Sequence, residues 1–209
     1  MFTWAKEAGL VQANPARDVR RVYTSSEGHH TWTEAEIEHY KERHPLGTKA
    51  HLALMIMLLT GVRKSDAVKL GRQHERKGAD GKTLVFTATK NKGRKPVRIE
   101  IPLLPELQKV LDASKTGDMT YLVTEHGRPF SVAGFGNKMR SWCDEAGLPE
   151  CSSHGLRKAA ATTAAENGAS VHMLMSMFGW LTFSEAERYT AAVERRKLAA
   201  NGMGLMIRK

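Results

Sequence analysis

The segment SHGLRKAAATTAAENGASVHMLMSMFGWLTFSEAERYT, residues 153–190, holds the side chains around which the rest of the chain is organised. His154 and Arg157 stand three positions apart, so on a helix both side chains share one face and can point at one ligand. A Gly-Trp pair follows at 179–180, and Tyr189 comes soon after a predicted helix start. This pattern indicates a site for an anion and a nucleophile, which needs further cations from elsewhere in the chain.

The composition supplies those cations. The formal net charge is +10 and the pI is near 9.8, which favours a polyanionic partner, most often nucleic acid, over a merely solubilising basic surface. Two cysteines are too few for a disulfide framework. The start of the sequence does not resemble a signal peptide, and the longest apolar run, residues 52–59, is too short to span a membrane. We therefore expect a soluble intracellular protein.

The first 30 residues differ in character from the rest. Their apolar positions predict a short amphipathic helix over residues 2–8, closed by Gly9, and residues 16–30 have the composition of a polar, basic linker. A length of 209 residues allows one large domain plus a remnant of another. We predict that residues 1–30 are the end of a preceding domain with its linker, and that residues 31–209 form one domain with a C-terminal tail.

Side-chain caps and glycine or proline stops divide residues 31–209 into helices. Capping boxes are predicted at Thr33 with Glu36 and at Ser184 with Glu187, and single caps at Thr48, Ser131, Ser153 and Ser170. The stops are predicted at Pro45, Gly61, Gly147 and Gly168. A short helix from Ser65, another over residues 104–111, and a last helix running from Ser184 through Ala200 complete the set.

Two stretches predict strands. Residues 83–87 (TLVFT) and 97–101 (VRIEI) are rich in β-formers, and a basic tip at 90–95 separates them, as in a hairpin. Residues 121–123 are a candidate for a short edge strand. The sequence therefore predicts an α+β fold, mostly α-helical, with a small antiparallel β-sheet inserted after the third helix.

The chemistry suggested by the sequence involves neither metal nor nucleotide. There is no HExxH, CxxC or GxxxxGK[ST] pattern, so we expect no metal and no cofactor. A tyrosine of pKa near 10 needs a base or an anion-stabilising field to become a nucleophile, and arginines supply bidentate contacts to phosphate. The candidates are Arg63, Lys90 or Lys92, His154, Arg157, Trp180 and Tyr189. Taken singly, each has a commoner reading as a cap, a core residue or a solvated charge.

Their order along the chain resembles the tyrosine recombinase (phage integrase) family. TGVRKSDAVKL at 60–70 resembles the family's first arginine box, and Thr89-Lys90 followed by residues 97–102 resembles its lysine-bearing hairpin. His154-Gly155-Leu156-Arg157 matches the His-x-x-Arg box, and Phe178-Gly179-Trp180 followed by Tyr189 matches the last one. The resemblance covers residues 30–200. The sequence departs from the commoner family residues at Asp66 (Glu), Gly155 (Asp) and Trp180 (His).

The resemblance implies the family's catalytic-domain (DNA breaking-rejoining) fold and a role for each candidate. Tyr189 would attack the scissile phosphate to give a 3′-phosphotyrosine, with Arg63 and Arg157 on the non-bridging oxygens and Trp180 as a further donor. Lys90, or else Lys92, would protonate the leaving oxygen, and His154 would assist proton transfer at the tyrosine. Asp66 would support Arg63 or His154.

The same resemblance implies the biological setting. The expected activity is site-specific recombination without metal or ATP. The expected partners are double-stranded DNA and further copies of the chain, as a tetramer on DNA, in the cytoplasm of a prokaryotic cell. Spare basic residues, Lys158 and Arg140 among them, would contact backbone phosphates. Two alternatives stay open: a non-catalytic helical DNA-binding module, and a type IB topoisomerase-like relaxing enzyme. Whether Tyr189 lies in its own chain's site is also open.

Overall fold

The computed structural model describes residues 2–17, 19, 28–79, 81–90, 95–203 and 206. In this part of the chain the elements are α1 (Phe2–Glu7), α2 (Glu34–Arg43), α3 (Lys49–Thr60), α4 (Lys64–Ala67), the 3₁₀ helix η1 (Arg72–His74), β1 (Glu75–Gly78), β2 (Gly81–Thr87), β3 (Arg98–Pro102), α5 (Pro105–Ala113), α6 (Val132–Glu145), α7 (Ser153–Glu166), α8 (Val171–Phe178) and α9 (Phe183–Met203). The predicted α+β class is confirmed. None of the described helices is long and apolar enough to cross a membrane.

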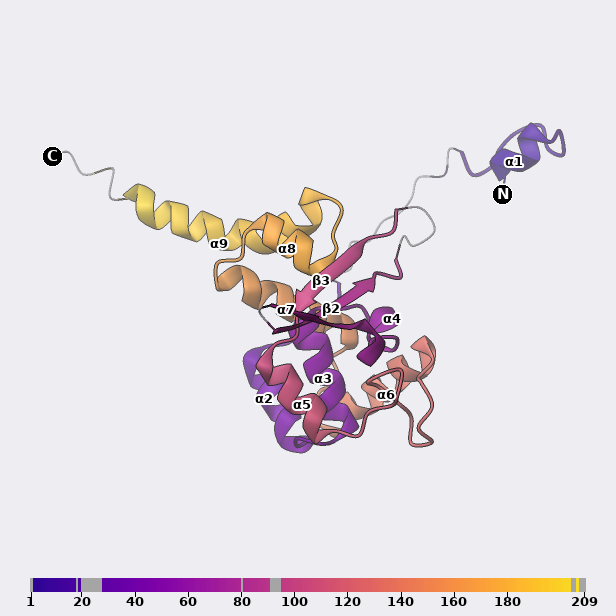
Figure 1. Cartoon of the computed structure of the whole chain (residues 1–209). Helices are drawn as coiled ribbons and strands as arrows, with labels where there is room; N and C mark the ends of the chain where they lie inside the picture. The colour runs from indigo at the N-terminus through magenta and orange to yellow at the C-terminus, as the bar shows by residue number, and fades with distance from the viewer. Residues whose placement is uncertain are drawn as a thin grey trace.

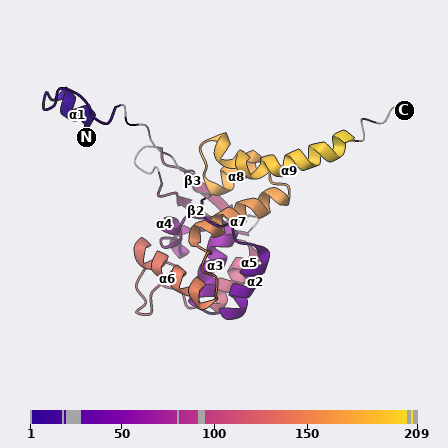
Figure 2. The same ribbon diagram turned by 180° about the vertical axis from the view of Figure 1, so that it is seen from behind.

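Helix α7 joins two layers of packing (Figures 1 and 2). On one side, its residues Leu156 and Ala159 belong to the larger apolar core, which also takes in α2, α3, α5, α6 and the sheet. On the other side, Ala161 and Ala165 belong to a smaller core with α8 and α9. The helix α1 lies apart from both and buries no residue. The predicted domain boundary at residue 30 adjoins residues 20–27, which lie outside the described part.

Local capping places most helix starts where the sequence predicted them. The box of Thr33 and Glu36 is present in full, and the hydroxyls of Thr48, Ser131 and Ser170 accept hydrogen bonds from the first turns of α3, α6 and α8.

Two predicted caps are wrong. Ser152, not Ser153, caps α7, because its hydroxyl accepts the Gly155 N–H. Helix α9 begins before Ser184, and Glu185 replaces the predicted Glu187: its carboxylate accepts from the Leu181 N–H at 3.3 Å and the Thr182 hydroxyl at 3.2 Å. Tyr189 consequently lies well inside α9.

The sheet confirms the predicted hairpin and adds a strand. Strands β2 and β3 pair antiparallel with Phe86 opposite Ile99, and their alternating apolar residues face the core. The additional strand β1 (ERKG) pairs with β2 at the edge. The predicted edge strand at 121–123 is wrong, since only an isolated bridge between Val123 and Pro129 is present there. Residues 91–94 of the hairpin tip, Lys92 included, lie outside the described part.

Gly61 forms the junction between α3 and the first arginine box. It has φ 60°, a left-handed conformation, and its N–H bonds the Met57 carbonyl to close α3. A Cβ at this position would overlap the ring of Phe178 at the end of α8. A glycine is therefore required here both by the backbone conformation and by the close approach of α8.

We expect Gly61→Ala to destabilise the fold by about 2–4 kcal/mol, combining the left-handed penalty with the ring overlap. Gly147→Ala is the matched control, because Gly147 has φ 68° and open space around its Cβ, so it should lose only about 1–2 kcal/mol. Urea unfolding followed by circular dichroism measures both. Equal losses would show that the contact with Phe178 contributes nothing.

Candidate active site

A cleft of about 690 Å³ gathers five of the six predicted site residues. These are Arg63 at the start of α4, His154 and Arg157 on α7, Trp180 between α8 and α9, and Tyr189 on α9. Gly28 and His29, which precede α2, and Lys158, Thr162, Glu185 and Arg188 also line the cleft. Lys90 does not: it is exposed just beyond the end of β2.

Arg157 connects the backbone segments that line the cleft. Its guanidinium donates to the Gly61 carbonyl and, at 2.8 Å, to the Phe178 carbonyl. It also lies over the rings of Phe178 and Trp180, 5.0 and 5.4 Å from their centroids. Burial and the neighbouring Arg63 lower the pKa of Arg157 to about 9, so the group remains a cation at neutral pH.

Aromatic stacking places the tyrosine. The Trp180 ring lies between Phe178 and Tyr189, with centroid distances of 4.8 and 5.2 Å and interplanar angles of 15° and 4°. Tyr189 is half-buried, and burial raises the pKa of its phenol although Arg188 and Arg157 act in the opposite direction. The tyrosine of this chain therefore lies in this chain's own cleft and is protonated at neutral pH.

Arg63 and His154 complete the polar wall. The Arg63 carbonyl accepts from the N–H groups of Asp66 and Ala67, but its guanidinium has no hydrogen-bond or ion-pair partner among the described residues, which leaves it available to a ligand. Burial lowers the pKa of His154, and electrostatic interactions with His29, Lys64, Arg157 and Arg63 lower this pKa further. The imidazole is consequently neutral at pH 7 and can accept a proton.

The model of the phage integrase family matches residues 33–196. The chain belongs to this family. Among solved structures, lambda integrase residues 75–356, a dimer bound to a COC′ core site, matches with a TM-score of 0.74 at 18% identity over 90% of this chain and 68% of that one. The Tn1549 transposon integrase in complex with a circular-intermediate DNA matches with a TM-score of 0.67 at 17% identity, covering 94% and 75%.

XerA recombinase matches with a TM-score of 0.63 at 17% identity, covering 86% of this chain and 66% of that one. At such identities the likeness shows the shared fold. This family member spans little more than half of several of the longer integrase chains, 55% in the case of another lambda integrase dimer. No curated protein matches its sequence.

The hairpin that carries Lys90 is anchored by Asp66. The buried Asp66 carboxylate accepts the Thr89 N–H at 2.8 Å, and Lys69 donates to the Thr89 hydroxyl at 3.3 Å. Among the described residues Asp66 makes no hydrogen bond or ion pair with Arg63 or His154, so the expectation that it supports one of them stays a prediction. Sequence reasoning missed the contact between Asp66 and Thr89 because the two partners are 23 positions apart. Asp66 fixes the base of the hairpin next to Lys90.

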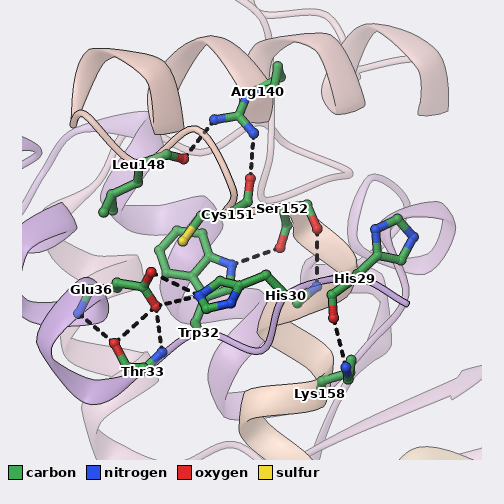
Figure 3. A network of polar contacts seen from close by, with 11 residues as sticks. His29, His30, Trp32, Thr33, Glu36, Arg140, Leu148, Cys151, Ser152 and Lys158 are labelled. Atoms are coloured by element: carbon green, nitrogen blue, oxygen red, sulfur yellow. Dashed lines mark hydrogen bonds and ion pairs between the residues drawn. The ribbon is translucent and has the colours of Figure 1, made fainter. Parts of the chain in front are cut away.

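Two basic residues expected to contact DNA have partners within the chain. Arg140 donates to the carbonyls of Leu148, Pro149 and Cys151 and pairs with Asp144 at 2.9 Å, as Figure 3 shows in part. Lys158 donates to the His29 carbonyl at 2.7 Å. Arg140 is therefore a structural residue that holds the α6–α7 connection, and it is not a spare cation.

His30, Glu36 and Cys151 could in principle hold a metal, since their ligand atoms lie within 4.8 Å of one another. However, the Glu36 carboxylate already accepts from His30 at 2.8 Å and from the N–H and hydroxyl of Thr33 (Figure 3). Burial also raises the pKa of the Cys151 thiol to about 12, which disfavours a thiolate ligand. His30, Glu36 and Thr33 therefore form a hydrogen-bonded network, and these contacts do not favour a metal site.

We expect Asp66→Ala to accelerate amide hydrogen exchange at Thr89 about ten- to a hundredfold, because a hydrogen bond to a charged acceptor contributes about 1.5–3 kcal/mol. Exchange measured by NMR at Thr89 checks this. Asp112→Ala is the control, since Asp112 accepts only from the exposed Gln108 side chain among the described residues. Unchanged exchange at Thr89 would contradict the anchoring role of Asp66.

Proposed function

We propose that the chain is the catalytic part of a site-specific DNA recombinase that cleaves and rejoins DNA through a 3′-phosphotyrosine on Tyr189. The observation that carries the proposal is the convergence of Arg63, His154, Arg157, Trp180 and Tyr189 on one cleft, with the tyrosine stacked at its wall. Membership of the phage integrase family supports it. The arrangement offers a nucleophile, a proton acceptor and two cations that could bind one phosphate without metal.

In the proposed cleavage step, the Tyr189 oxygen forms a bond to phosphorus while the bond to the 5′ oxygen of the next nucleotide breaks. His154 accepts the phenolic proton, and a lysine of the hairpin, Lys90 or else Lys92, gives a proton to the leaving 5′ oxygen. Arg63, Arg157 and the Trp180 N–H stabilise the charge on the non-bridging oxygens. The phosphodiester energy stays in the phosphotyrosine, so a 5′-hydroxyl of a partner strand can reverse the step without ATP.

The proposed substrate is double-stranded DNA, held by the +10 net charge. Self-association on DNA is part of the proposal, since lambda integrase is solved as a dimer on a core site and as a tetramer on a Holliday junction. We place the reaction in the cytoplasm of a prokaryotic cell. We also propose that residues 1–30 end a preceding DNA-clamping domain, because the family match begins at 33 and α1 buries no residue.

We expect Tyr189→Phe to abolish covalent adducts with DNA while leaving duplex binding intact. The substrate is a pool of nicked duplexes with a randomised core, in which loss of the short cleaved strand traps the adduct. SDS-resistant protein–DNA species are recovered and sequenced. Binding without any adduct from the unsubstituted protein would favour the non-catalytic DNA-binding module. Plasmid relaxation without exchange between two recovered sites would favour the topoisomerase-like alternative.

We expect Arg157→Ala to lower adduct formation by about two to three orders of magnitude, because it removes a preorganised cation from the phosphate. Duplex affinity should fall only slightly, since one phosphate contact among many is minor. Because Arg157 also binds two carbonyls, Arg157→Lys and a thermal melt of each variant separate lost folding from lost catalysis. Parallel losses of affinity and cleavage in a folded variant would identify Arg157 as an ordinary DNA contact.

A further inference from the structure

We propose that His29, four positions before the family-matched region, is a positioning residue of the active site that covers one face of the His154 ring and favours the neutral form of that ring. Its ring stacks on the His154 ring with a centroid distance of 4.7 Å and an interplanar angle of 14°. It also lines the cleft beside Arg63, Arg157 and Tyr189. The inference rests on the proposed function, because His154 is the proton acceptor there.

His29 is held in this place by the segment 28–32, which we name the strap. Lys158 donates to the His29 carbonyl at 2.7 Å, and the Trp32 indole N–H donates to the Ser152 carbonyl at 2.9 Å. Between them, His30 contacts both oxygens of Glu36 at 2.8 Å (Figure 3). The strap is thus fixed to α2 and to the N-terminal part of α7, by contacts at His29 and at the two positions His30 and Trp32 after it.

Gly155 allows this close passage. A Cβ at Gly155 would overlap the His30 carbonyl oxygen and would lie 2.8 Å from Cδ1 of Trp32. Any larger residue at the position after His154 would therefore displace the strap. The glycine next to His154, the proposed proton acceptor, is therefore the residue of α7 that lets the strap pass close to this helix.

The stack has a chemical consequence. His154 faces His29 from the strap, Lys64 and Arg63 from α4 and its start, and Arg157 from α7 itself, while Lys158, Arg188 and Glu185 line the same cleft. His29 covers the His154 ring and also interacts with it electrostatically, and both effects lower the pKa of His154. The strap therefore keeps the imidazole in the neutral, proton-accepting form.

The stack with His29 extends the pH range of cleavage on its acid side. A lowered pKa keeps His154 neutral at pH values where an ordinary histidine is protonated, so cleavage persists to lower pH. Without His29, the pKa of His154 should rise toward the ordinary value near 6.5. The acid limb of the cleavage profile should then move to higher pH, while the plateau above neutrality stays.

The test compares His29→Ala and His29→Phe with His126→Ala, an exposed histidine on a turn that does not line the cleft. Histidine ring resonances of the DNA-free protein are titrated by NMR. We expect a higher pKa of His154 in His29→Ala, a smaller rise in His29→Phe, which keeps the stacked ring, and no change in His126→Ala. Gly155→Ala, once shown to be folded by a thermal melt, should reproduce the rise by displacing the strap. An unmoved pKa of His154 in His29→Ala overturns the proposal.

The second readout is the pH profile of adduct formation on sites recovered from the nicked pool. We expect His29→Ala to form adducts about two- to threefold more slowly than the unsubstituted protein near pH 5 and equally fast above pH 7.5. A uniform loss at every pH would show a merely structural role and overturn the proposal. If the unsubstituted protein forms no adduct at all, the proposed function fails, whereas the NMR titration still decides whether His29 acts on His154.

Discussion

The contact on which the site depends is the guanidinium of Arg157 bound to two backbone carbonyls, those of Gly61 and Phe178. These carbonyls end α3 and α8, so one side chain fixes two distant helix ends against α7. Carbonyl dipoles satisfy the donors of the guanidinium without cancelling its charge, whereas a carboxylate would neutralise it. Because the pKa of Arg157 is about 9, the buried group remains a cation at neutral pH, and its positive charge can interact with a phosphate.

The same helix ends carry the apolar half of the site. Phe178 fills the space that the missing Cβ of Gly61 leaves open, and its ring continues into the stack with Trp180 and Tyr189. The tyrosine is thus positioned by packing against a floor that Arg157 holds in place, and it needs no hydrogen bond of its own for this. The smaller core of α7, α8 and α9 sets where α9 presents Tyr189, the proposed nucleophile.

The sequence alone predicted the structural features that depend on neighbouring residues and the site residues that follow the order of the family's motifs. The caps at Thr33, Thr48, Ser131 and Ser170, the stop at Gly61 and the β2–β3 hairpin follow from neighbouring residues. The predictions failed where two residues satisfy the same local capping pattern, as Ser152 and Ser153 do. They also failed where the structure of a segment depends on a partner that is distant in the sequence. The charged β1 is a strand only because β2 offers it a partner, and Asp66 finds Thr89 through the fold. Motif order located five cleft residues, but it gave no signal for His29, whose partner His154 lies on α7, far along the chain.

The resting electrostatics of the cleft explain how a phosphate could switch the proposed reaction on. Cations outnumber the single described acidic lining residue, Glu185, and burial together with this field keeps His154 neutral. For Tyr189 burial outweighs the same field, so the phenol keeps its proton. Proton transfer from phenol to imidazole is therefore unfavourable in the empty cleft. A phosphate between the arginines adds negative charge, which stabilises an imidazolium and makes His154 a stronger base when the substrate is in place. In the proposed reaction, a nucleophile that keeps its proton in the empty cleft is thus paired with an acceptor that becomes a stronger base when the phosphate binds.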